Sequence, residues 1–252
     1  MSYRIKKTLA VFFIVFVISF TTTENTFLQT SNNVLLEYCT GIWCGYCPCA
    51  DQIIDSILVE FPNTVVLAYH GENDDPWKNY SEGIRSLLGF YAYPSGIIGR
   101  RSGVVYRQTW DSLVTVQNIN QPTVSIDIVR SYNPSTRVLN ATANVTALIN
   151  LTGDYYVNFV LTENNIVYPQ AVSPGCGIVG TDSNYIHNHV VKGMLNGDRG
   201  VLLNSSNPWN QNTTESKSIN YNIPIGIAAE NCNIVVFVYK SAGVFSSECH
   251  IQ

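Results

Sequence analysis

The chain has 252 residues, of which 46 % are hydrophobic and 13 % charged, a composition that supplies one large or two small folded cores and argues against a disordered protein. Acidic residues outnumber basic ones by 18 to 14, for a formal net charge of −4. This balance disfavours a nucleic-acid partner, because phosphate binding needs a basic surface. Seven cysteines are many for a cytosolic enzyme and few for a disulfide-packed miniprotein.

The N-terminal segment has the pattern of a secretory signal peptide. Arg4, Lys6 and Lys7 precede an apolar run at residues 9–20, LAVFFIVFVISF, which is followed by the polar TTTEN. This run is shorter than the roughly 20 residues that cross a bilayer, so we expect a removed signal peptide at residues 1–23 and no transmembrane segment afterwards. Loss of those three bases moves the net charge from −4 to −7. We expect an exported protein in the periplasm, on the outer-membrane surface or outside the cell.

The first part of the mature chain, residues 32–120, alternates short apolar strands with helical stretches, which is typical of an α/β fold. Apolar residues between 53 and 61 recur at helical spacing, and Pro62 stops that helix. We expect strands at 33–39, 64–70, 96–99 and 104–107, and helices at 44–61, 80–90 and 109–119.

The second part, residues 122–252, is rich in strands separated by loops of Asn, Gly, Ser and Thr. Alternation with a period of two predicts strands at 124–128, 138–149, 155–163, 184–195, 218–223 and 233–240. Six strands over about 130 residues are typical of an immunoglobulin-like β-sandwich. The sequence therefore predicts an α/β domain followed by an all-β sandwich domain.

The segment LEYCTGIWCGYCPCADQII, residues 36–54, contains a C-x-x-C pair, Cys44 and Cys47. The pair lies where a predicted strand ends and a predicted helix begins, so its thiols face free N–H groups and the positive end of the helix dipole. Such surroundings lower a cysteine pKa from about 8.5 to between roughly 3.5 and 7.5. We expect Cys44 to be the exposed nucleophile and Cys47 to resolve the mixed disulfide, with no organic cofactor.

The run W-C-G-Y-C-P at residues 43–48, between a strand and a helix, resembles the thioredoxin superfamily. The resemblance implies a thioredoxin-like fold for the first part of the chain. It implies that Glu37 is a buried carboxylate that assists proton transfer, and that Pro94 is a cis-proline facing the disulfide. The Gly-Tyr dipeptide between the cysteines is similar to that of periplasmic disulfide isomerases.

These features predict an exported thiol–disulfide oxidoreductase that exchanges or isomerises disulfides of envelope or secreted proteins. Its partners are then protein thiols and disulfides, together with a redox partner that recycles the cysteine pair. We place substrate contacts at the aromatic residues Trp43, Tyr46 and Tyr93.

A second resemblance covers nearly the whole mature chain. The segments EYCTGIWCGYCP, YPSGIIGR and YIHNHVVKG resemble motifs of the Omp28-related outer-membrane protein family of Bacteroidetes. Many members of that family have a lipoprotein leader, whereas no cysteine directly follows the apolar run here. The alternative function is a non-enzymatic binding or structural protein of the cell envelope, in which a thioredoxin-like scaffold is held by a structural disulfide.

Other interpretations of the cysteine cluster remain open. Cys39, Cys44 and Cys47 have the C-x4-C-x2-C spacing of a plant-type [2Fe–2S] cluster, and Cys49 completes a possible zinc set with the C-x-x-C pair. Export argues against both metal sites. Cys39 and Cys49 either bond each other, are ordinary buried residues, or relay the disulfide of the pair.

The second part offers a few further candidates. His187 and His189 lie two apart on a predicted strand and so share a face, as a chelating pair would, although polar side chains on a solvated face explain them equally well; we predict no metal. We expect a Cys176–Cys232 disulfide. Cys249 is then the candidate for a free thiol or an intermolecular bond.

Overall fold

The computed structural model of the chain describes residues 33–240 and 249–251, so the expected signal peptide at residues 1–23 lies outside the described residues. Within that range the protein is rich in β structure, with few helices and a largest sheet that mixes parallel and antiparallel pairs. None of the described helices combines the length and the apolar composition that a bilayer crossing requires.

The first part of the chain alternates strands and helices. Its elements are β1 (Val34–Thr40), α1 (Cys47–Glu60), β2 (Thr64–His70), the 3-10 helix η1 (Lys78–Tyr80), α2 (Glu82–Leu88), β3 (Ser95–Ile98), β4 (Val105–Tyr106), the 3-10 helix η2 (Arg107–Thr109) and α3 (Trp110–Asn118). β1 pairs in parallel with β2 and antiparallel with β3, which pairs antiparallel with β4. α1 begins three residues later than the sequence predicts, because Pro48 favours the first helical turn and a tight turn occupies the preceding residues.

The second part consists almost entirely of strands. The longer ones are β5 (Val124–Asn133), β6 (Val138–Ala147), β7 (Tyr155–Glu163), β12 (Val190–Met194), β14 (Thr214–Asn222) and β15 (Cys232–Lys240). The shorter elements are β8 (Ile166–Val167), β9 (Gln170–Val172), β10 (Gly180–Asp182), β11 (Ile186–His187), β13 (Val201–Leu202), the 3-10 helix η3 (Ala229–Asn231) and β16 (Cys249–Ile251). These strands of two or three residues are too short to give a periodic signal in the sequence.

The single strand expected at residues 184–195 is wrong. The chain breaks between β11 and β12 because His189 has a left-handed φ of 58°. The backbone N–H of His189 donates to the side-chain oxygen of Asn164 at 2.7 Å, and its carbonyl accepts from Ala68 of β2 at 2.9 Å. His189, at this break, therefore connects the second part of the chain to β2 of the first part.

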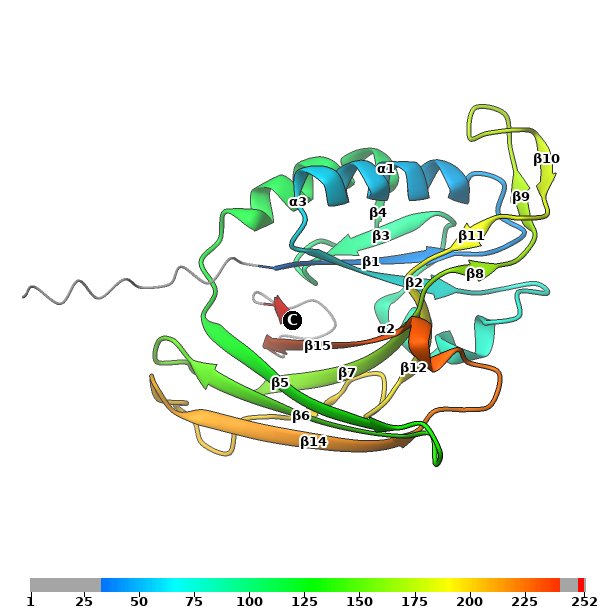
Figure 1. The fold of residues 1–252 in the computed structure, drawn as a ribbon. Helices are drawn as coiled ribbons and strands as arrows, with labels where there is room; N and C mark the ends of the chain where they lie inside the picture. Colours follow the sequence, from blue (N-terminus) through cyan, green and yellow to red (C-terminus); the bar gives the residue numbers. More distant parts are fainter. Residues whose placement is uncertain (1–32, 241–248, 252) are drawn as a thin grey trace, which may run out of the picture.

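One large sheet runs through both parts (Figure 1). Within the described residues its nine strands follow the order β16-β15-β7-β12-β2-β1-β3-β4, with β13 also paired to β7. The parts join where Val190 of β12 pairs in parallel with Ala68 of β2. The boundary expected near residue 121 falls between α3 and β5, and the hydrogen bonds of this sheet connect the segments on either side of it. β5, β6 and β14 form a separate three-stranded antiparallel sheet.

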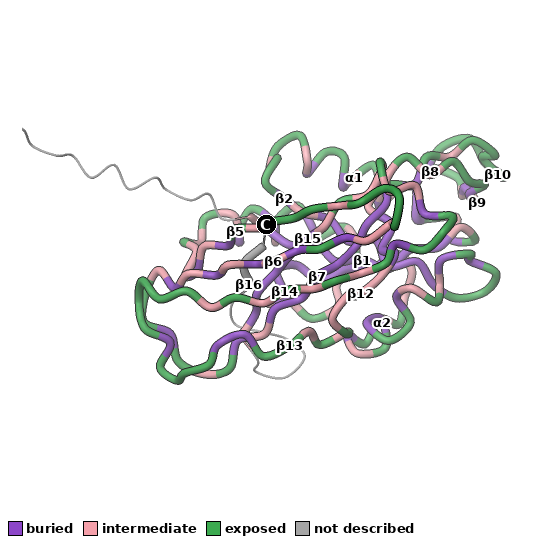
Figure 2. Tube along the Cα trace, turned by 60° about the horizontal axis from the view of Figure 1, so that its bottom comes forward, coloured by how far each residue is buried: buried purple, intermediate pink, exposed green. Residues whose placement is uncertain are grey.

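The core lies on both faces of the large sheet. α1 and α3 cover one face of its β1–β4 end, and the three-stranded sheet packs below β7 and β15 (Figure 1). Val236 and Val238 of β15 face the small sheet, whereas Phe237 and Tyr239 face a cluster that includes α2 and β2. β7 and β15 consequently appear as buried segments in the interior of the molecule (Figure 2).

Residues 164–189, between β7 and β12, leave the sheet and extend toward the start of α1 (Figure 1). We call this segment the arm. Within it β8 pairs with β11 and β9 pairs with β10, both antiparallel. The arm thus brings residues of the second part to the cysteine cluster of the first.

Candidate functional site

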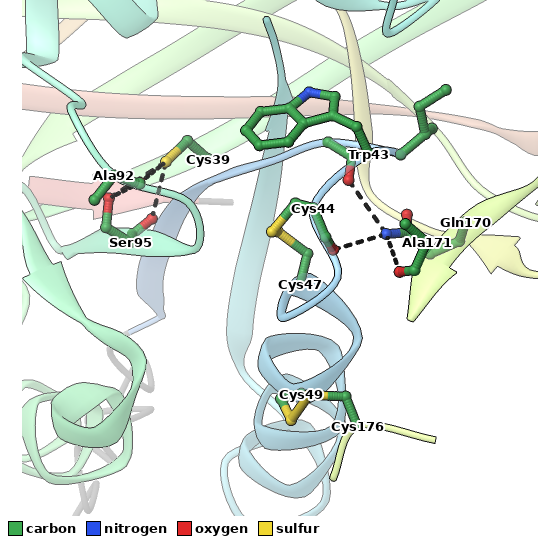
Figure 3. The surroundings of a disulfide bond; sticks show 12 residues. Cys39, Trp43, Cys44, Cys47, Cys49, Ala92, Ser95, Gln170, Ala171 and Cys176 are labelled. Carbon is green, nitrogen blue, oxygen red and sulfur yellow. Dashed lines mark hydrogen bonds between the residues drawn. A yellow bond between two sulfur atoms is a disulfide. The ribbon is translucent and has the colours of Figure 1, made fainter. Parts of the chain in front are cut away.

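Cys44 and Cys47 form a disulfide where β1 leads into α1, with Cα atoms 5.4 Å apart (Figure 3). The turn is closed by hydrogen bonds from the Cys44 N–H to the Gly41 carbonyl and from the Cys47 N–H to the Cys44 carbonyl. No side chain caps α1 and no acidic residue occupies its first turn. The positive end of the helix dipole is therefore available to stabilise a thiolate.

The expectation that Cys44 is exposed is wrong for this disulfide state. Only 4 % of Cys44 is exposed, and Cys47 is fully buried. The turn is enclosed because the loop of Ala92 and Ser95 lies on one side of it, Trp43 lies next to it, and the arm lies on the other side (Figure 3).

The aromatic residues proposed to contact substrate surround this turn. Trp43 packs against Tyr93 with ring centroids 5.1 Å apart. This contact brings the loop of Pro94, whose peptide bond to Tyr93 is cis, next to the turn that contains Cys44. Trp43 and Tyr46 are exposed, so a protein segment that approaches the disulfide can reach both rings.

The arm binds the turn through hydrogen bonds that the sequence did not reveal. Gln170, Ala171 and Ser173 together donate four hydrogen bonds of 2.7–3.2 Å to the turn. The acceptors are the backbone carbonyls of Gly41, Ile42, Cys44 and Gly45. The arm thereby fixes the backbone on both sides of Cys44.

Glu37 does not lie beside the cysteine pair. Its neighbour Tyr38 packs in the cluster with α1, whereas the Glu37 carboxylate, on the other face of β1, accepts the Arg100 guanidinium at 2.9 and 3.0 Å and the Tyr69 hydroxyl at 2.7 Å. All three side chains of this group are buried. Because the sheet separates Glu37 from Cys47, this geometry does not support the expected proton-transfer role.

A different carboxylate, Asp51, lies one helical turn after Cys47 on α1, at a spacing that places both on one face. It accepts the hydroxyls of Tyr38 at 2.8 Å and of Tyr185, from the arm, at 2.5 Å. Burial raises the pKa of Asp51 above its ordinary value, although the two tyrosine hydroxyls act in the opposite direction. A cavity of about 80 Å³ adjoins the carboxylate, enough for water. Sequence analysis missed Asp51, and its four-residue spacing from Cys47 is the signal that could have identified it.

Asp75 fixes the start of the turn. Its side chain lies 2.8 Å from Nδ1 of His70 and accepts the backbone N–H groups of Ile42 at 3.0 Å and Trp77 at 2.9 Å. Burial alone would raise the pKa of Asp75, but the contacts with His70 and these N–H groups hold it below its usual value. Since Ile42 belongs to the turn, a buried anion orders the approach to Cys44.

His187 and His189 do not share a strand face, so that expectation is wrong. β11 ends at His187, and the left-handed backbone at His189 intervenes before β12. Burial lowers the pKa of His187 to about 4, and its Nε2 lies 3.1 Å from the carbonyl of Tyr168. Among residues 33–240, no group of three or more His, Cys, Asp or Glu side chains is placed to hold a metal ion.

The remaining cysteines pair differently from the expectation. Cys49 is bonded to Cys176, with Cα atoms 4.7 Å apart, so the expected Cys176–Cys232 bond is wrong, because the loop of Cys176 belongs to the arm and meets α1 rather than β15. Cys39 and Cys232 are free thiols, and burial raises the pKa of each to about 11. The side chain of Cys249 lies outside the described residues.

A solved structure shares the fold of this chain at low sequence identity. HBP35 of Porphyromonas gingivalis is similar with a TM-score of 0.66 and 16 % identity, over 88 % of this chain and 75 % of that one. A structural-genomics target from Agrobacterium tumefaciens gives 0.49 and 15 %, over 89 % and 95 % of the two chains. A domain of the outer membrane lipoprotein Omp28 from Porphyromonas gingivalis gives 0.32 and 18 %, over 52 % and 86 %. No curated protein matches the chain.

A family described as "Outer membrane protein Omp28" matches residues 83–248, which is about two thirds of the chain. The matched segment extends from α2 through the arm and β15 and contains the YPSGIIGR and YIHNHVVKG motifs. Cys44 and Cys47 precede it, so the match does not depend on the cysteine pair. The chain therefore belongs to the Omp28 family of outer membrane proteins.

Proposed function

We propose that this protein is a thiol–disulfide oxidoreductase of the cell envelope whose reactive group is the Cys44–Cys47 pair. The observation that carries the proposal is the disulfide at the uncapped N-terminus of α1, next to the loop of Pro94. The family description supports an envelope location in the periplasm, on the outer-membrane surface or outside the cell.

The fold supports this function in finer detail. The proposal includes a thioredoxin-like unit, which is supported by parallel β1 and β2, antiparallel β3 and β4, and the covering helices α1 and α3. It also includes a sandwich of immunoglobulin-like size, which is supported by the three-stranded sheet packed on β7 and β15. In this proposal the sandwich, together with the arm, positions the redox unit.

The chemistry is a two-electron exchange. The Cys44 thiolate attacks one sulfur of a substrate disulfide, so that a Cys44–substrate bond forms and the other substrate sulfur leaves as a thiolate. Cys47, as thiolate, then attacks the Cys44 sulfur, which releases the second substrate thiolate and forms the Cys44–Cys47 bond. The substrate is reduced, the pair is oxidised, and a redox partner with a dithiol restores the pair. The reverse sequence oxidises a substrate.

We assign Asp51 as the base that accepts the proton of the Cys47 thiol. A fully buried thiol must lose its proton before it can attack, and Asp51 lies on the same face of α1 one turn away. As a base it must be ionised, so its raised pKa predicts a resolving step that accelerates as the pH rises through that pKa.

Asp51→Asn is expected to slow resolution of the mixed disulfide by about 100-fold, the ordinary contribution of a general base. The variant should also lose the rise in rate with pH, while the first attack by Cys44 keeps its rate. Stopped-flow kinetics at several pH values separate the two steps. The control is Asp55→Asn, an exposed carboxylate on the next turn of α1. An unchanged rate and pH profile in Asp51→Asn would assign the proton to another group.

The test of the proposed function is a trapping experiment. Cys47→Ala removes the resolving thiol, so we expect covalent complexes between Cys44 and envelope proteins that reducing agent dissolves. Non-reducing gels of the exported protein show these complexes as bands that wild type lacks. The double variant Cys44→Ser/Cys47→Ala is the control and should form none, whereas Cys47→Ala with the separate thiol replaced by Cys232→Ala should still form them.

The alternative is a non-enzymatic binding or structural protein of the envelope, and the burial of Cys44 favours it. In that case the Cys44–Cys47 bond only holds the turn. A folded and exported Cys47→Ala protein that forms no covalent complexes would support this alternative.

A further inference from the structure

The arm is attached to α1 at three positions on its first two turns. Cys49 is bonded to Cys176, the side chain of Gln52 donates to the carbonyl of Cys176 at 3.0 Å, and Asp51 accepts the hydroxyl of Tyr185. α1 is also the helix whose N-terminus holds the reactive pair. The arm and the pair therefore share one structural support.

The arm also packs tightly against the turn itself. A side chain at Gly45 would place its Cβ 2.2 Å from the hydroxyl oxygen of Ser173 in the arm. Gly45 does not have a positive φ, so its own backbone conformation permits a side chain. Close approach of the arm, rather than a turn conformation, is what requires glycine between Cys44 and Cys47.

The tip of the arm consists of glycines and exposed residues on either side of Cys176. Gly175 and Gly177 flank Cys176 with positive φ angles of 87° and 144°, and the next residues, Ile178 and Val179, are 92 % and 62 % exposed. The tip projects beyond the rest of the molecule (Figure 1). The Cys49–Cys176 bond and the adjacent contact from Gln52 attach this end of the arm to α1.

We propose that the Cys49–Cys176 disulfide is a second redox site, and that its reduction by a dithiol releases the arm and opens the Cys44–Cys47 pair to protein partners. This inference rests on the proposed function only for the disulfide exchange that the opened Cys44–Cys47 pair carries out. The opening itself is a property of the arm and can be measured without any enzymatic assay.

The reduction proceeds in two balanced steps. A thiolate of the dithiol attacks the sulfur of Cys49, the less buried of the two cysteines, forming a mixed disulfide, and Cys176 leaves as a thiolate and takes a proton. The second thiol of the reductant, as a thiolate, then attacks the reductant sulfur that is bonded to Cys49. This closes a disulfide within the reductant and releases Cys49 as a thiolate. Two electrons pass from the dithiol to the Cys49–Cys176 pair, and four hydrogen bonds from the arm to the turn lose their covalent support.

The experiment follows reduction of Cys44–Cys47 in the full chain by a reduced protein dithiol, with alkylation and mass spectrometry at timed intervals. In wild type, Cys49–Cys176 should be reduced before Cys44–Cys47. In the double variant Cys49→Ser/Cys176→Ser, reduction of Cys44–Cys47 should be about tenfold faster or more, because the arm is already free. Cys232→Ser, which removes a thiol on β15, should leave the rate unchanged.

A second variant tests the arm with both disulfides in place. Gly45→Ala directs a methyl group at Ser173, so it should displace the arm from the turn and also accelerate reduction of Cys44–Cys47. Unchanged rates in both variants, or reduction of Cys44–Cys47 before Cys49–Cys176 in wild type, would overturn the proposal. Faster reduction in the variants with no trapped partners for Cys47→Ala would support the second redox site and contradict the proposed function, so the two failures are distinguishable.

Discussion

Arg100→Met is expected to lower the free energy of unfolding by about 3–5 kcal/mol, because it leaves the buried Glu37 carboxylate without its counter-charge. Glu37 is 0 % and Arg100 1 % exposed, and two hydrogen bonds join them. The guanidinium also lies over the rings of Phe237 and Tyr239 of β15, at 4.5 and 4.7 Å from the ring centroids. The variant therefore weakens contacts between the turn after β3 and β15 as well as an ion pair.

Urea denaturation measures this loss, and two variants control it. Glu37→Gln combined with Arg100→Met removes both charges and should recover most of the lost stability, since a buried charge without a partner is the main cost. Arg130→Met removes an exposed arginine on β5 and should change little. A loss below about 1 kcal/mol in Arg100→Met, the range of an exposed ion pair, would contradict the buried-pair explanation.

Elements that depend on local pattern could be predicted from the sequence. The predicted strand at 155–163 has the bounds of β7, and the predicted helix at 109–119 differs from α3 by one residue at each end. Both have a clear hydrophobic period and turn residues at their ends. The continuous sheet could not be predicted, because the parallel pairing of Val190 with Ala68 joins residues far apart in the sequence.

The candidate site was predictable where a motif is contiguous. Cys44 and Cys47 occupy the expected strand–helix junction, and the contact of the Trp43 ring with Tyr93 places the Pro94 loop beside them. The arm has no such motif: two of its four hydrogen bonds to the turn come from backbone N–H groups and two from the Gln170 side chain, and the partners of both kinds depend on tertiary structure.

Strand geometry explains why Glu37 does not lie beside the cysteine pair as predicted. Successive residues of a strand point to opposite faces, so one position decides which face a side chain occupies. Tyr38 faces α1, and Glu37, one residue earlier, faces Arg100 and Tyr69 instead. The group that faces α1 from β1 is a phenol, and it bonds to Asp51 of the helix.

The proposed function depends on the reactivity of Cys44. Because Cys44 makes the first bond to substrate in the proposed mechanism, Cys44→Ser should reduce disulfide exchange by about a thousandfold or more, to the background level. Cys47 does not replace Cys44 as the first nucleophile, since it is fully buried. The free thiols Cys39 and Cys232 have pKa values raised to about 11, so they are largely protonated at neutral pH and unreactive.

The direct measurement is insulin reduction by the full chain with excess dithiothreitol, which also reduces Cys49–Cys176. The proposed mechanism predicts that wild type reduces insulin faster than dithiothreitol alone and that Cys44→Ser does not, while Cys232→Ser retains the wild-type rate. Wild type that gives no more than the dithiothreitol rate, with a Cys44–Cys47 bond that resists reduction, would contradict the account.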